Sequence, residues 1–150
     1  MREEDHQSPF IDKLLHPETG RIQDAGEVNR LCDVIRQTSF DIHKFLRSGH
    51  LEKVYENALA HRLAKIGIHA IQQHPLDVCD EDGTPLGHLS ADLFVENTLV
   101  VEVKACRVLV DEHVAQLLGS LRASRIEHGL LINFDGAKLQ IKKYILNKNT

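Results

Sequence analysis

Asp92, Glu102 and Lys104 are the residues whose types and spacing suggest chemistry in this sequence. They fall in two apolar, β-branched segments, residues 89–95 and 99–106, which predict neighbouring strands. Because side chains alternate between the two faces of a strand, Glu102 and Lys104 share one face. Two carboxylates beside an ammonium group predict a site that binds a divalent cation and hydrolyses a phosphodiester.

A turn at residues 96–98 sets the register of this hairpin. A three-residue turn there pairs Val95 with Leu99, so that Asp92 faces Glu102 with Cβ atoms about 5 Å apart. Carboxylates in that position repel, because each raises the cost of ionising the other. A Mg²⁺ or Mn²⁺ ion between them would offset the repulsion, since such cations prefer carboxylate oxygens, water and phosphate. We therefore predict that Asp92 and Glu102 are metal ligands.

A solvated salt-bridge cluster on an exposed strand is the alternative explanation, because Glu-x-Lys is a common tripeptide. Against it, residues 99–105 are apolar except at Glu102 and Lys104, which is typical of a strand covered on both sides. Charges inside such a strand need partners, and a metal ion is one.

Helices and further strands must position the hairpin. Apolar residues at spacings of three and four predict amphipathic helices at 27–47 and 51–66, packed against each other, and a third helix from Asp111. Additional strands are predicted at residues 68–78, 129–134 and 139–146. The order helix, helix, three strands, helix, two strands predicts an α/β (α+β) domain at residues 27–150, preceded by an irregular arm at residues 1–26.

Charge and cysteine content limit the classes of protein that fit. The 150 residues include 18 Lys and Arg against 22 Asp and Glu, a net charge of −4, so any nucleic-acid site must be local. No apolar run approaches the ~18 residues of a membrane span, and the first residues do not resemble a secretory signal. The 3 cysteines form no CxxC pair and the 10 histidines no HExxH motif. We expect a cytoplasmic protein with no membrane contact and no organic cofactor.

A further motif, Gly49-x-x-Glu52-x-x-Tyr55, begins the second predicted helix. Together with Asp92 and Glu102-x-Lys104, it resembles the GxxExxY proteins of the PD-(D/E)xK nuclease superfamily. The resemblance runs from about residue 27 to residue 146, and the proline of the superfamily motif is Ala91 here.

This resemblance implies a restriction-endonuclease-like core, a mixed β-sheet flanked by helices with an N-terminal helical segment. It implies that Glu52 joins Asp92 and Glu102 as a metal ligand and contributes to catalysis. It also implies that Lys104 orients the attacking water and that Gln116, on the third helix, fixes the substrate or that lysine. The expected activity is metal-dependent hydrolysis of DNA or RNA.

Some of these residues also have plainer explanations. Glu52 suits the start of any helix, where the macrodipole favours an acid. Tyr55 lies on the apolar stripe, so we expect it to pack in the core. His113, Gln116 and Ser120 form a polar line along the third helix, although some relatives have a tyrosine where this chain has Ser120.

A local basic patch is needed to bring a phosphate backbone to an acidic protein. We predict that Arg107, Arg122 and Arg125 supply it beside Lys104. Two alternatives remain open: a catalytically inactive module that keeps the nuclease fold for nucleic-acid or protein binding, and a subunit that forms a homodimer through its N-terminal helices.

Overall fold

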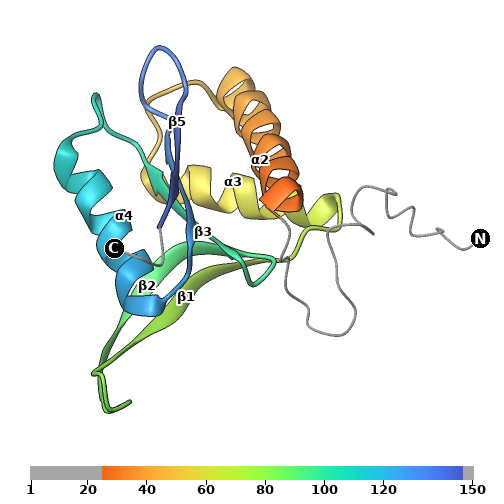
Figure 1. Cartoon of the computed structure of the whole chain (residues 1–150). Coiled ribbons are helices and arrows are strands. Elements are labelled where there is room, and N and C mark those ends of the chain that lie inside the picture. The colour runs from red at the N-terminus through yellow and green to blue at the C-terminus, as the bar shows by residue number, and fades with distance from the viewer. Residues whose placement is uncertain (1–24, 147–150) are drawn as a thin grey trace, which may run out of the picture.

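The computed structural model describes residues 25–146 (Figure 1). In chain order its elements are α2 (Ala25–Leu46), α3 (Glu52–Lys65), β1 (Ala70–Cys79), β2 (Pro85–Val95), β3 (Leu99–Lys104), α4 (Asp111–Ser124), β4 (His128–Asn133) and β5 (Gln140–Ile145). The predicted order of elements is confirmed. α2 begins at Ala25, two residues before the predicted start of the helix. The irregular arm predicted at residues 1–26 otherwise lies outside the described residues and stays a prediction.

The five strands form one sheet in the order β1-β2-β3-β4-β5. β3 and β4 run parallel and are connected through α4, whereas the other neighbours are antiparallel. A parallel pair needs a crossover connection of this kind, while the antiparallel pairs are joined by short turns. The predicted mixed sheet flanked by helices is therefore confirmed.

Helices cover both faces of the centre of the sheet (Figure 1). The apolar sides of α2 and α3 pack on one face of β3, around Val101 and Val103. α4 packs on the other face, where Leu117 and Leu121 meet Val100. The prediction that this apolar strand is covered on both sides is confirmed, so charges on it lie within a three-layer structure.

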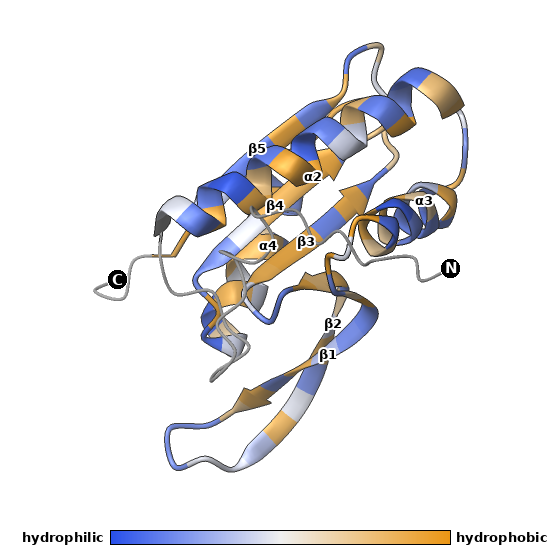
Figure 2. Cartoon of the chain, turned by 90° about the vertical axis from the view of Figure 1, so that its right-hand side faces the viewer, coloured by the Kyte–Doolittle hydropathy of each residue, from blue (hydrophilic) through white to orange (hydrophobic). Residues whose placement is uncertain are grey.

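The hairpin formed by β1 and β2 extends beyond these layers (Figure 2). Residues 85–90 of β2 are exposed, whereas Ala91, Leu93, Phe94 and Val95 are buried. Asp92 thus lies where the hairpin leaves the protein core.

The outer surface of α2 retains exposed aromatic side chains. Phe40 is 48% and Phe45 76% exposed. Self-association through the N-terminal helices stays a prediction.

Within the described residues, no helix is both long and apolar enough to cross a membrane.

Candidate active site

The hairpin between β2 and β3 has the predicted register. Val95 pairs with Leu99 and Leu93 with Val101, and the backbone pairing ends there. One step further, the carboxylate of Asp92 accepts a hydrogen bond from the backbone N–H of Val103 at 2.8 Å, through Oδ2. The side chain of Asp92 therefore continues the contact between the strands after the backbone pairing stops.

Glu102 lies beside Asp92, as the register predicts. Burial, the negative charge of Asp92 and hydrogen bonding with its carboxylate raise the pKa of Glu102 from 4.5 to about 8, although the nearby ammonium group of Lys104 acts in the opposite direction. At neutral pH and without a cation, Glu102 therefore holds a proton. The repulsion between these carboxylates is the property that a divalent cation would relieve.

A cavity of about 400 Å³ lies between β3 and α4. It is lined by Leu89, Ser90, Glu102, Lys104, His113, Gln116, Leu117, Gly119 and Ser120. The predicted polar line along the third helix is confirmed, since all three of its members face this cavity with Glu102 and Lys104. The walls combine a carboxylic acid, an ammonium group and an amide, which suits a phosphate ester with water beside it.

Glu52, the first residue of α3, lies at the edge of this group. The pKa of Glu52 is raised, by partial burial first and also by the negative charge of Asp92, although the ammonium group of Lys104 acts in the opposite direction. The charges of Lys104 and Asp92 thus act on Glu52, and its role as a metal ligand stays a prediction. Its side chain is exposed, so solvent reaches this side of the site.

The Gly49-x-x-Glu52-x-x-Tyr55 motif fixes the entry into α3. Tyr55 is fully buried, as predicted, and its hydroxyl donates to the carbonyl of Arg47 at 2.5 Å. Its ring stacks on Phe134, with ring centres 4.7 Å apart. Gly49 has φ +102°, which favours glycine, and its N–H donates to Asp135 at 2.9 Å. The motif thus anchors the segment that places Glu52.

The arginines predicted to contact nucleic acid lie in two places, the loop after β3 and the C-terminal end of α4. Arg107 lies in the loop after β3, close in sequence to Lys104. Arg122 is in the last turn of α4 and Arg125 is its C-cap residue. Since each helical residue adds about 1.5 Å, Arg122 lies about 9 Å further along the axis than Gln116. Only Arg107 follows directly from the strand that carries the site.

Asp92 and Glu102 fit a divalent cation. Mg²⁺ and Mn²⁺ take one or two carboxylates and complete their coordination with water and phosphate. Burial first, and then the negative charge of Asp92, raise the pKa of Glu102, and a bound cation would favour the ionised form of both acids. Within residues 25–146, no three His, Cys, Asp or Glu side chains are gathered in a geometry that would hold a metal ion. A three-carboxylate shell that includes Glu52 is therefore not preformed.

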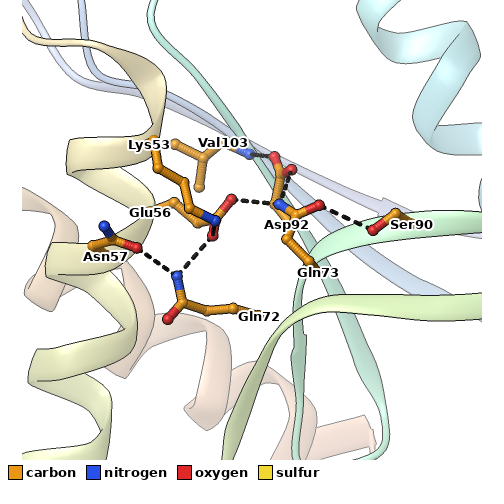
Figure 3. A network of polar contacts seen from close by, with 8 residues as sticks. All are labelled: Lys53, Glu56, Asn57, Gln72, Gln73, Ser90, Asp92 and Val103. Atoms are coloured by element: carbon orange, nitrogen blue, oxygen red, sulfur yellow. Dashed lines mark hydrogen bonds and ion pairs between the residues drawn. The ribbon is translucent and has the colours of Figure 1, made fainter.

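A polar network behind Asp92 was missed by the sequence analysis (Figure 3). Glu56, only 3% exposed, accepts hydrogen bonds at 2.7 Å from Lys53, Gln72 and Gln73. Glu56 follows Glu52 by one helical turn, so its position on the same side of α3 was readable from spacing. The two glutamines gave no such signal, because their role depends on how closely β1 approaches α3.

Asn133 is a second residue that was missed. It is fully buried at the end of β4, where its amide donates to the carbonyl of Cys106 at 2.8 Å and its oxygen accepts from the N–H of Cys106 at 3.1 Å. These bonds fix the loop that carries Arg107. An Asn that ends an apolar strand was its only sequence signal.

Comparison with known proteins finds a matching family model and a structure with some similarity. The sequence model of one protein family, described as the PD-(D/E)XK nuclease superfamily, matches residues 29–144. The solved structure of an alkaline exonuclease from Laribacter hongkongensis is similar, with 10% sequence identity and a TM-score of 0.47, over 87% of this chain and 74% of that chain. None of the curated proteins matches this sequence.

Proposed function

We propose, because this chain belongs to the PD-(D/E)XK nuclease superfamily, that it hydrolyses phosphodiester bonds of DNA or RNA with Mg²⁺ or Mn²⁺ as cofactor. Within the superfamily, the Gly49-x-x-Glu52-x-x-Tyr55 motif favours the narrower GxxExxY family. The proposed nuclease activity does not depend on membership of the GxxExxY family, because the chemistry depends on the hairpin and not on that motif alone.

The observation that carries the proposal is the electrostatic coupling of Asp92, Glu102 and Lys104 beside one cavity. Asp92 and Glu102 would hold the metal ion, and Glu52 would complete its shell directly or through water. When bound, such an ion polarises the phosphoryl oxygen and lowers the pKa of a water molecule. The protein's part is to place that ion and the substrate in a partly enclosed site.

Lys104 and Gln116 supply the remaining groups in this proposal. The ammonium group of Lys104 lies in the cavity wall, where it can orient the attacking water and offset negative charge that develops on the phosphate. The Gln116 amide, across the cavity on α4, can donate to a phosphate oxygen. Arg107, in the adjoining loop, would meet the next phosphate of the strand.

Cleavage of labelled nucleic acid tests the proposal. The purified chain is incubated with DNA and RNA, single- and double-stranded, with Mn²⁺, Mg²⁺ or EDTA. We expect metal-dependent cleavage that falls by about 10²-fold or more in Asp92→Ala and in Lys104→Ala. Lys65→Ala is the matched control, because this exposed lysine ends α3 far from Glu52. Cleavage that survives both site substitutions would overturn the assignment, and absence of cleavage would favour the inactive-module alternative.

A further inference from the structure

Gln73 connects α3 to the metal-site hairpin through its side-chain amide (Figure 3). Its Nε2 donates to Oε1 of Glu56 at 2.7 Å and to Oδ1 of Asp92 at 3.2 Å. Its Oε1 accepts from the hydroxyl of Ser90 at 3.0 Å. One neutral side chain thus contacts two carboxylates and the strand that bears Asp92.

The backbone of β1 is unusual at this position. Gln73 has φ +50°, in the left-handed region, although it lies within a strand and is not glycine. Its neighbours Gln72 and His74 pair with Leu93 and Ala91, so Gln73 stands opposite Asp92. A non-glycine residue in this conformation is strained, and such residues persist where the surroundings hold them. The strain coincides with the contact to Asp92.

Glu56 gives Gln73 a fixed partner on the other side. Glu56 is 3% exposed, and its carboxylate also accepts hydrogen bonds from Lys53 and Gln72, each at 2.7 Å. An amide suits the position between Glu56 and Asp92, because its two N–H groups can serve both acids without adding a charge. A carboxylate at position 73 would have no hydrogen to donate when ionised.

Both oxygens of Asp92 are therefore oriented by the protein. Oδ2 accepts from Val103 and Oδ1 from Gln73. Each carboxylate oxygen has about two acceptor sites, so these bonds fix the direction of the group and leave lone pairs for a cation. Mutation of a group that orients a metal ligand typically weakens metal binding by about 10- to 100-fold.

We propose that Gln73 is a positioning residue, which holds Asp92 in the orientation for cation binding and is itself anchored by Glu56. The inference rests on the proposed function, because it assumes that Asp92 is a metal ligand. Gln73 makes no contact with substrate in this account and acts only through Asp92.

Calorimetric titration of the metal-free chain with Mn²⁺ tests this role without any substrate. Gln73→Gly removes the amide and suits the positive φ, which offsets part of the stability lost with the hydrogen bonds, so the variant should remain folded. Its Kd for Mn²⁺ should rise by about 10- to 100-fold. Asn97→Gly is the matched control: it also replaces an exposed amide residue at positive φ, +54°, but in the β2–β3 turn, and its Kd should not change.

Amide hydrogen exchange of Val103 is a second measurement, which needs no metal. If Gln73 holds Asp92, the Val103 amide should exchange faster in Gln73→Gly than in the parent and in Asn97→Gly. An unchanged Mn²⁺ affinity together with unchanged exchange would overturn the role of Gln73 and leave the proposed function standing. A parent chain that binds no Mn²⁺ would overturn both.

Discussion

Oδ2 of Asp92 accepts a hydrogen bond from the backbone N–H of Val103 at 2.8 Å. This bond places the Asp92 carboxylate next to Glu102, the residue that precedes Val103 on β3. It forms where the backbone pairing of β2 with β3 ends at Leu93. The place where the hairpin leaves the core is thus also the place where two acids are forced together.

The stability of the metal-free chain should fall as pH rises through the neutral range. The folded-state pKa of Glu102, about 8, exceeds its ordinary value of 4.5, so the folded state binds more protons between these values and loses stability as pH rises. Glu102→Gln should remove this dependence and stabilise the chain at pH 8 by on the order of 3 kcal/mol.

Denaturant unfolding at pH 5, 6, 7 and 8 in EDTA measures this effect. Glu81→Gln, in the exposed turn between β1 and β2, is the control and should keep the slope of the parent. Equal slopes in the parent and in Glu102→Gln would show that the Glu102 carboxyl group titrates normally.

Mn²⁺ should reverse this loss of stability. A ligand that binds only the folded state stabilises it by about 2.7 kcal/mol at a concentration 100 times its Kd. The melting temperature at pH 8 should therefore rise with Mn²⁺ concentration in the parent but not in Asp92→Ala. Asp77→Ala, an exposed acid on the same hairpin, should respond like the parent. The same rise in Asp92→Ala would place the metal elsewhere.

Loss of Glu56 should destabilise the fold much more than loss of its lysine partner. Glu56→Ala leaves the amides of Gln72 and Gln73 without their shared acceptor, which we expect to cost about 2–4 kcal/mol. Lys53→Ala should cost less than about 1 kcal/mol, because the Lys53 side chain is 56% exposed. Denaturant midpoints of the two variants measure the difference, and equal midpoints would contradict the anchoring role of Glu56.

Tyr55→Phe separates the two roles of the motif tyrosine. The stacking on Phe134 should survive, but the hydrogen bond to the Arg47 carbonyl is lost, at a cost of about 1 kcal/mol. Thermal unfolding measures this cost. A variant as stable as the parent would show that the hydroxyl does not help to anchor the segment before α3.

Periodicity was enough to predict the elements of this fold. The apolar stripe of α2 and the alternation in β3 are both local patterns, and they gave the helix, the strand and the faces they bury. The restriction-endonuclease-like α+β core was implied by the family resemblance, and the mixed sheet and the family match confirm it. The predicted starts of two elements were wrong by a few residues: α2 begins at Ala25 and β2 at Pro85. Tertiary contacts or an exposed hairpin set the ends of such elements.

From the residues alone, the site was predictable only as far as its residues lie close together along the chain, and the roles of Glu52 and Gln116 came from the family resemblance. Register arithmetic placed Asp92 beside Glu102 because the turn between them is short. Gln73 and Asn133 were missed, because the first depends on an unusual φ in β1 and the second on a loop that folds back on β4. Neither the backbone strain nor the loop contact leaves a repeating pattern in the sequence.

The central claim is that Asp92 and Glu102 hold a divalent cation in a nuclease site. Crystals of the chain soaked in Mn²⁺, with data collected for the anomalous signal of manganese, test it directly. The account predicts an anomalous peak bonded to the carboxylates of Asp92 and Glu102, and no peak there in Asp92→Ala crystals. Clear density for both side chains without a peak between them, at saturating Mn²⁺, would contradict it.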